Sequence, residues 1–536
     1  MNFKYIKNIL PAATLMLAMG FTSCIGDLDV TPIDPSTTME ADNDALFNKC
    51  YANMAVAGNG GANGDCDIDG LDGGTTGFVR QLFNANSLTT DESICCWGDE
   101  GIPAFNYGQW GASHPMLKGF YYRLYFGVTM CNFYLTEASD YNPTMTAEIR
   151  FLRALYYYYL MDGWGNIPFL TEVASEPAQQ ASRKEVYDFI ETELLECVED
   201  MSEPKAKKST DEGYGRADKA AAWMLLARLY LNAEVYTGTA QWAKAAEYAK
   251  KVMDSPYSLF TNGNSNWSAY QMLFMGDNGE NGASCEALLP LLQDGLTTTS
   301  WGTTLFLMAG CWKDDMIEPG LPAGNNTTQN WQGNRARPEF VAKFFPNGDA
   351  PAVVPSEMVV AAGDDRALLW GKDRTLSVDD VSEFTSGYSV TKFTNYYSTG
   401  AAAKHSDYTD TDFFLMRVAE AYLTYAEATT RAAGSNQVGA EAKAAIDAIR
   451  SRAHAAIKAN YSLNDILDEW AREFYYEGRR RIDLIRYGQF GGNSTYMWQW
   501  KGGVQAGTTF NSNLNIFAIP DTDMNANSNL VQNPGY

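Results

Sequence analysis

The chain has 536 residues, of which 46% are hydrophobic and 13% aromatic, so it has enough apolar side chains to bury a large core. Its formal net charge of -25 at pH 7 repels phosphate backbones and argues against nucleic acid as a partner. Only three histidines are present, and none lies in an HExxH or GxSxG context. Histidine-based catalysis therefore has no support in the sequence.

The first 23 residues have the pattern of a secretory signal peptide. Lysines precede an apolar run at residues 9–19, which is well short of the roughly 20 residues that span a bilayer. The sequence Phe-Thr-Ser-Cys at residues 21–24 resembles a bacterial lipobox, in which the cysteine is acylated and becomes the first residue of the mature chain. We therefore expect lipidation of Cys24, with residues 24–536 forming one domain held at a membrane surface. The alternative is an ordinary signal peptide and a chance cysteine.

The remaining cysteines are scattered along the chain, and no pair has CxxC spacing. Zinc and thioredoxin-like redox sites are therefore not indicated. Disulfides in an exported chain and buried thiols are both compatible with this pattern. These cysteines are Cys50, Cys66, Cys95, Cys96, Cys131, Cys197, Cys285 and Cys311.

Long segments with apolar residues at helical spacing predict a mainly α fold. Alanines at the crossing of two consecutive segments would let their helices approach closely, and a unit of roughly 35 residues is typical of a TPR-like helical hairpin. Such a hairpin must stack on neighbours to bury its apolar face. The predicted helices span residues 147–161, closing at Gly163, and then 216–232, 242–253, 413–428 and 440–455.

Two regions between the helical segments differ in character. Residues 58–110 and 262–411 are rich in Gly, Asn, Asp, Thr and Trp and have no long helical periodicity. They carry aromatic side chains that would be costly to leave in water, so they predict long structured insertions. Long loops on a rigid scaffold are a common location of binding residues.

Charged residues near the C-terminal end recur about three, four and seven positions apart, which suits ion pairs along packed helical turns. A structural role is the favoured interpretation, because charges on a helix more often pair or contact solvent than catalyse. These residues are Glu473, Glu477, Arg479, Arg480, Asp483 and Arg486.

Stretches spread over the mature chain are specific enough to indicate a family. They are AEIRFLRALYYYYLMDGWGNIPF, GRADKAAAWMLLARLYLNAEVYTG, FLMRVAEAYLTYAEA, DEWAREFYYEGRRRIDLIRYG and the closing AIPDTD and NPGY. Together they resemble the SusD/RagB family of outer-membrane lipoproteins from Bacteroidetes. The resemblance implies a TPR-like scaffold that docks on a SusC-like TonB-dependent transporter and presents a glycan site at the cell surface. Asp27 and Asp29, just after Cys24, are similar to signals that send such lipoproteins to the cell exterior.

The insertions contain candidate residues for a glycan site. A neutral sugar is bound by flat aromatic side chains with hydrogen-bonding groups beside them. Against the starch-binding member of the family, two polar candidates fall on glucan ligands and two tryptophans fall on an aromatic arc. At the third position of the arc Cys95 stands where that member has a tryptophan, which leaves open whether starch or an α-1,6-linked glucan is preferred. The candidates are Asp72, Arg80, Trp97, Asp99, Glu100, Trp301 and Trp331.

The resemblance implies non-catalytic binding of starch or a related α-glucan, which is then delivered to the transporter. For any of the tryptophans the alternative is a place in the core. Two other functions remain open: a peptide-capturing RagB-like lipoprotein, and a glycoside hydrolase in which Asp72, Asp99 and Glu100 supply two carboxylates across a cleft.

Clustered oxygen ligands in the second insertion suggest a calcium site, since Ca²⁺ prefers such hard ligands and the starch-binding relative holds one ion through related positions. The alternative is turn formation by Asp and Asn next to Gly, which needs no metal. The residues are Asp277, Asn278, Glu280, Asp410 and Asp412. No organic cofactor is expected.

Overall fold

The computed structural model describes residues 42–536. The predicted signal peptide and Cys24 lie outside these residues, so both stay predictions. Residues 47–536 form one compact unit, and of the residues that precede it only 42–46 are described. The architecture below is that of residues 47–536.

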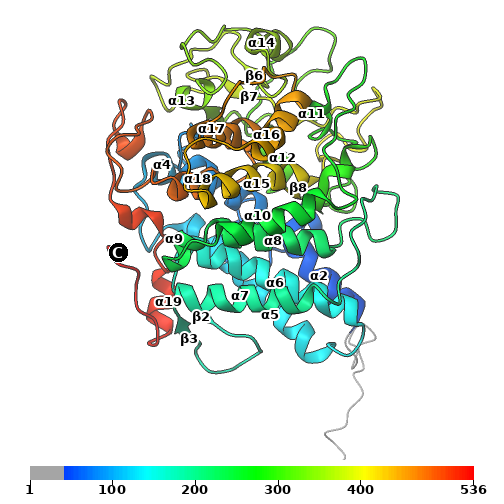
Figure 1. Ribbon diagram of the computed structural model, residues 1–536, viewed down its shortest axis with the longest axis vertical. Coiled ribbons are helices and arrows are strands. Elements are labelled where there is room, and N and C mark those ends of the chain that lie inside the picture. Colours follow the sequence, from blue (N-terminus) through cyan, green and yellow to red (C-terminus); the bar gives the residue numbers. More distant parts are fainter. Residues whose placement is uncertain (1–41) are drawn as a thin grey trace, which may run out of the picture. The chain divides into compact units, whose positions relative to one another are not determined.

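Helices dominate the described chain (Figure 1). The N-terminal half contains α2 (Asn43–Ala55), α3 (Phe78–Phe83), α4 (Ile102–Tyr107), α5 (Pro115–Glu137), α6 (Pro143–Trp164), α7 (Arg183–Cys197), α8 (Lys219–Leu231), α9 (Ala233–Thr237) and α10 (Trp242–Met253). The C-terminal half contains α11 (Ala269–Met272), α12 (Thr304–Ala309), α13 (Pro338–Val341), α14 (Pro355–Ala362), α15 (Val418–Ala432), α16 (Ala440–Arg452), α17 (Leu463–Phe474), α18 (Arg480–Arg486) and α19 (Asp521–Ala526).

The strands are short and pair two by two, always antiparallel. None of the described sheets has a third strand, so the strands join loops to the scaffold and form no layer of their own. The pairs are β1 (Ser93–Cys95) with β5 (Asn334–Ala336), β2 (Ile167–Phe169) with β3 (Gln179–Ala181), β4 (Ala287–Leu291) with β8 (Phe413–Arg417), and β6 (Leu369–Trp370) with β7 (Ser389–Val390).

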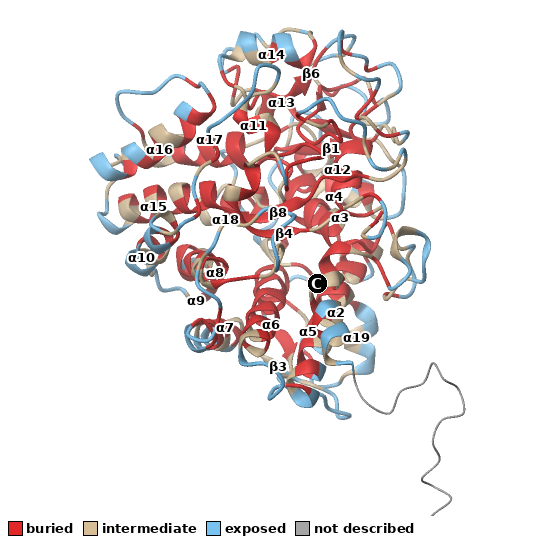
Figure 2. Ribbon diagram, turned by 90° about the vertical axis from the view of Figure 1, so that its right-hand side faces the viewer, coloured by how far each residue is buried: buried red, intermediate tan, exposed pale blue. Residues whose placement is uncertain are grey.

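The helices stack in consecutive antiparallel pairs, as a TPR-like scaffold requires (Figure 1). α5 packs on α6 and α6 on α7, while α10 lies between α8 and α15, and α15 also packs on α16. Alanines Ala220, Ala221, Ala245 and Ala249 are fully buried where α8 and α10 meet, which permits their close approach. α6 is buried along almost its whole length (Figure 2) because neighbouring helices cover it on several sides.

Most of the helices that the sequence predicts lie close to their expected bounds. Residues 242–253 form α10 as expected, and the helix predicted at 147–161 extends to Trp164, where Gly165 in the left-handed region (φ 69°) ends it. The helix predicted at 216–232 begins later, at Lys219, because the Asp218 side chain accepts a hydrogen bond from the backbone of Ala220 and caps it.

The helix predicted at residues 413–428 is wrong over its first turn. Phe413–Arg417 is strand β8, and the helix α15 begins at Val418. All the residues of β8 are buried, and the strand pairs with β4 from the second insertion. A short apolar run buried on both faces has no periodicity that separates strand from helix, so its distant partner decides its conformation.

The predicted insertions hold only short elements, in agreement with their lack of periodicity; α14, with 8 residues, is the longest described helix in them. The second insertion gathers at one end of the scaffold, where α13, α14, β6 and β7 lie beyond α15–α18 (Figure 1). Its loops are held by hydrogen bonds between distant segments. They are therefore structured parts of the body, and not linkers.

The charged residues near the C-terminal end form buried ion pairs. Glu473 is completely buried and pairs with Arg417, Arg452 and Arg366. Arg480 pairs with Asp91 at 2.7 Å, and Asp483 pairs with Arg479 and Arg486. These guanidinium groups hold the pKa of Glu473 well below its usual range despite burial, which alone would raise it. The structural interpretation of these charges is confirmed.

Among the described residues no disulfide is formed, and no helix has the length and apolar character needed to cross a membrane. Of the two alternatives left open for the cysteines, the structure has thiols, most of them buried.

Candidate functional site

Two loops that are distant in the sequence meet to build the candidate site. The backbone N–H of Arg80 donates to the carbonyl of Gly302 (3.0 Å), and a Cβ added at Gly77 would lie 2.5 Å from that same carbonyl oxygen. Glycine at both positions lets the backbones touch, which no other residue allows. The contact brings Asp72 and Arg80 from the first insertion beside Trp301 from the second.

Trp301 lies at the centre of three neighbouring aromatic rings, which we call the aromatic platform (Trp331, Trp301 and Tyr408). The ring of Trp301 lies 6.3 Å from that of Trp331 and 4.9 Å from that of Tyr408, and each pair is inclined by 50°. All three side chains are half-buried, so each keeps part of its surface in solvent. A row of inclined rings forms a curved apolar surface, and such a surface can stack against successive sugar rings.

Trp97 lies behind the platform. Its indole N–H donates to the carbonyl of Trp331 (3.0 Å), and its ring packs edge-on against Phe306. A Cβ added at Gly333 would lie 2.3 Å from the Trp97 ring, so the loop that carries Trp331 lies directly on that ring. Trp97 is thus brought together with the other candidates as a support for Trp331.

Cys95 does not face the site. It belongs to β1, pairs with Asn334 of β5 and is only 1% exposed. Burial raises the pKa of its thiol to about 12, which keeps the thiol neutral. The position where the starch-binding member of the family has a tryptophan is therefore turned into the body of this protein.

Arg80 supplies a positive charge next to the platform. Its guanidinium lies over the rings of Phe306 (5.0 Å) and Trp97 (5.6 Å). Burial lowers its pKa, and the charges of Asp72 and Asp99 act in the opposite direction, which places both carboxylates in its neighbourhood. Its Nε is buried and has no hydrogen-bond partner in the described structure.

The acidic candidates are exposed. Partial burial would raise the pKa of Asp72, but hydrogen bonds from the Thr75 hydroxyl (2.6 Å) and backbone (3.0 Å), with the Arg80 charge, lower it overall. Asp99 and Glu100 lie in the turn before α4 with their side chains in solvent. Asp72 and Asp99 therefore lie near enough to act electrostatically on Arg80, but no hydrogen bond or ion pair to it is described for them or for Glu100.

Sequence reasoning missed the third ring of the platform. Tyr408 lies in the acidic sequence YTDTD, two residues before Asp410. Its hydroxyl accepts a hydrogen bond from the Asn63 amide (2.6 Å), and the His405 ring lies 4.9 Å away. The available signal was an aromatic residue inside a polar loop, which is weak without knowledge of its neighbours.

The predicted calcium ligands lie close together but mostly bind protein donors. Asp277 accepts hydrogen bonds from Ser398, and Asn278 is bonded to the backbone of Asp412. Among the described residues, no three His, Cys, Asp or Glu side chains converge as a metal site would require. None of these carboxylates forms an ion pair with another described residue. Burial raises the pKa of Asp412 to about 7, and Asp410 keeps a buried Oδ1 without a hydrogen-bond partner. Glu280 is exposed.

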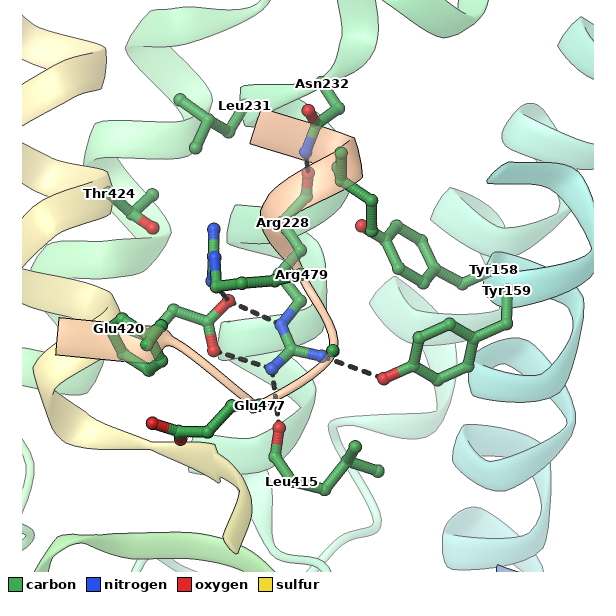
Figure 3. A pocket seen from close by; sticks show the side chains of 13 residues that line it. Tyr158, Tyr159, Arg228, Leu231, Asn232, Leu415, Glu420, Thr424, Glu477 and Arg479 are labelled. Atoms are coloured by element: carbon green, nitrogen blue, oxygen red, sulfur yellow. Dashed lines mark hydrogen bonds and ion pairs between the residues drawn. The ribbon is translucent and has the colours of Figure 1, made fainter. Parts of the chain in front are cut away.

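A second polar cluster lies in the scaffold and belongs to the fold. Figure 3 shows Glu420 between Arg228 and Arg479, with Arg228 also donating to the carbonyl of Leu415 and to the Tyr159 hydroxyl. The cavity beside it has a volume of only about 30 Å³, which is room for water and not for a sugar. The charged side chains around this cavity are already paired with one another, so none of them is free to bind a ligand.

Comparisons with known proteins identify the class. Residues 323–536 match the family model described as "SusD family", and residues 28–231 match one described as "Starch-binding associating with outer membrane". The chain belongs to the SusD family. It is 41% identical over 575 aligned positions to the "Starch-binding protein SusD" of Bacteroides thetaiotaomicron, covering 100% of both chains.

Solved structures agree with the fold. A SusD-like protein from Bacteroides fragilis has a TM-score of 0.67 at 19% identity, over 95% of this chain and 100% of that one. A "Laminarin binding SusD-like protein" has a TM-score of 0.64 at 21% identity, over 93% and 99% of the two chains. The mainly α, TPR-like scaffold is therefore confirmed as the fold of this family.

Proposed function

We propose that this protein binds starch or a related α-glucan at the cell surface, without cleaving it, and delivers oligosaccharides to a SusC-like TonB-dependent transporter. The observation that carries this proposal is the aromatic platform with Asp72 and Arg80 beside it. Rings stack on the C–H faces of the sugar, while the carboxylate and guanidinium bind its hydroxyls. The starch-binding protein that is 41% identical to this chain supports the choice of an α-glucan.

Each platform ring would contribute about 1 kcal/mol beyond the area it buries, so a single site binds weakly. A polysaccharide presents many repeats to many anchored copies, and this compensates for weak single sites. Lipidation of Cys24 would provide the anchor, and an outer-membrane location follows from it. The description of the N-terminal family match supports that location.

Affinity electrophoresis in starch, dextran and an unrelated polysaccharide tests the proposal. We expect an α-glucan to retard the protein, and Trp301→Ala and Trp331→Ala each to weaken binding about fivefold or more, because each removes one stacking ring. Trp242→Ala is the matched control, since Trp242 is a half-buried tryptophan on α10 of the scaffold. No retardation in either glucan would overturn the proposal.

Tyr408 gives a second test of the same platform. We expect Tyr408→Phe to keep most of the affinity and Tyr408→Ala to lose several-fold, because the ring stacks and the hydroxyl is already bonded to Asn63. Isothermal titration with maltoheptaose measures both. Equal affinities for the two variants would contradict a stacking role.

Two other functions give different results in the same experiments. A hydrolase that uses Asp72 and Asp99 would release reducing sugar during long incubation with starch, whereas we expect none. A peptide-capturing protein would copurify with peptides and show no glycan affinity. The partner is tested by co-purification with a SusC-like transporter from the same organism.

We also propose that Ca²⁺ binds near Asp410 and Asp412, two buried carboxylates that form no ion pair in the described structure. Asp277, Asn278 and Glu280 would complete the ligand set. Calorimetric titration of Ca²⁺ into chelator-treated protein is expected to show one site that Asp410→Asn removes. Absence of heat in the parent protein would favour the turn-forming role of these residues.

A further inference from the structure

A second cleft in the second insertion has the features of a sugar site. It has a volume of about 770 Å³, within the usual range for ligand sites, and is lined by residues of α11, α14 and the loops around residues 318–326 and 396–402. The indole of Trp267 borders it, stacked on Tyr396 with ring centroids 5.7 Å apart and an inclination of 23°. Neither ring belongs to the aromatic platform.

The aromatic pair in this cleft is held rigidly. The Tyr396 hydroxyl donates to the carbonyls of Pro322 (3.1 Å) and Gly324, which fixes its ring. The Asn264 side chain accepts hydrogen bonds from the backbone of Asn266 (2.8 Å) and Trp267 (2.9 Å), which fixes the turn that carries the indole. A pre-positioned ring loses little conformational entropy when it binds a sugar.

Polar groups without a described protein partner lie around the pair. Glu318 is only 9% exposed; its Oε1 accepts from the Ser356 backbone (3.0 Å), but its Oε2 has no described partner. In the described structure the Trp267 indole N–H and the Gln271 side-chain N–H₂ donate to no protein atom, although Gln271 accepts from the Ser268 backbone. One acceptor and two donors beside an aromatic surface match the hydroxyl rim of a neutral sugar.

The cleft is connected to the platform through one buried residue, Asn395. Its backbone N–H donates to the carbonyl of Asn325 (2.9 Å), its carbonyl accepts from the Asn326 side chain (2.7 Å), and its Oδ1 accepts from the backbone of Asp410 (2.8 Å). Asn326 lines the cleft and precedes Trp331 in the same loop, while Asp410 follows Tyr408. The two surfaces therefore have a fixed relation to each other.

We propose that this cleft, centred on Trp267, is a second glucan-binding subsite that takes another segment of the same polysaccharide. This inference rests on the proposed function, because the ligand class is that of the platform. A polymer that occupies two fixed subsites is bound with a higher apparent affinity than either subsite has alone, because binding at the first subsite raises the effective concentration of the polymer at the second.

Calorimetric titration with maltoheptaose tests the second subsite in the full protein. The parent is expected to bind two molecules per chain and Trp301→Ala/Trp331→Ala one. Adding Trp267→Ala to that double variant is expected to weaken the remaining binding by about fivefold or more, and Trp267→Phe to restore part of it. Trp242→Ala added to the double variant is the control and is expected to change nothing.

A second variant guards against a folding defect. Gln271→Glu with Glu318→Gln leaves the stacked pair and the acceptor for the Ser268 backbone in place, but removes the Gln271 donors and the charge of the Glu318 acceptor, so it is expected to weaken the same residual binding with unchanged circular dichroism. The second subsite is refuted if the double variant binds no maltoheptaose, or if its residual affinity is the same after every substitution in the cleft. Either result leaves the glucan-binding role of the aromatic platform unaffected. If the parent itself binds no glucan, both the proposed function and this subsite are refuted.

Discussion

Glu92 offers a sharp test of the electrostatics of the buried core. It is 1% exposed, and its carboxylate accepts a hydrogen bond from the backbone of Tyr476 (2.8 Å). Burial raises its pKa to about 7, against the lowering effects of Ser87, the Tyr476 backbone and Arg480. Glu92→Gln keeps the shape and the accepting oxygen but cannot ionise, so it isolates the energetic effect of the charge.

The sign and size follow from the two pKa values of Glu92. Because the folded pKa of about 7 exceeds the usual 4.5, the protonated side chain favours folding at low pH, and this stability is lost as the pH rises through 7. At 1.36 kcal/mol per pH unit, the raised pKa of Glu92 lowers the free energy of unfolding by about 1 kcal/mol at pH 5 and about 3 kcal/mol at pH 8. Glu92→Gln should therefore stabilise the protein by about 2 kcal/mol more at pH 8 than at pH 5.

Denaturant titrations of the parent and the variant at both pH values measure this difference. Glu357→Gln, an exposed carboxylate on α14, is the control and should give the same free energy of unfolding as the parent at both pH values. An equal effect of Glu92→Gln at pH 5 and pH 8, or a larger one at pH 5, would refute the reasoning.

Two further predictions concern the loop contact and the ion pairs. Gly77→Ala should lower both the glucan affinity and the thermal midpoint, because its Cβ would meet Gly302, and the free energy of unfolding should fall by about 1–3 kcal/mol. The control is Gly98→Ala, where a Cβ meets nothing; it should change neither the affinity nor the midpoint. Arg417→Ala should cost about 3–5 kcal/mol in denaturant unfolding at pH 7, because it leaves the buried Glu473 with one cation fewer. Because Arg417 lowers the pKa of Glu473, that cost should shrink as the pH falls below the usual Glu pKa of 4.5, and a cost that stays constant at acid pH would contradict it.

Local signals in the sequence predict the scaffold well. The apolar spacing of α10 and the alanines of α8 and α10 are readable without any structure, because the contacts of a helix recur every three to four residues. α5 was missed, although His114 caps it and Pro115 begins it, because its apolar residues surround the whole helix and weaken the periodicity. β8 was taken for a helix because its partner β4 lies far away in the sequence.

By itself, the sequence determined the helical fold, the family and the two tryptophans at the centre of the candidate site. Only the tertiary structure decided that Tyr408 completes the platform, that Cys95 faces inward and that Trp97 supports Trp331. Helices arise from neighbours along the chain, whereas these side chains are placed by contacts between loops more than 200 positions apart, such as that of Trp97 with Trp331. The direction in which a loop residue points is set by the backbone packed against it, and that backbone comes from elsewhere in the fold.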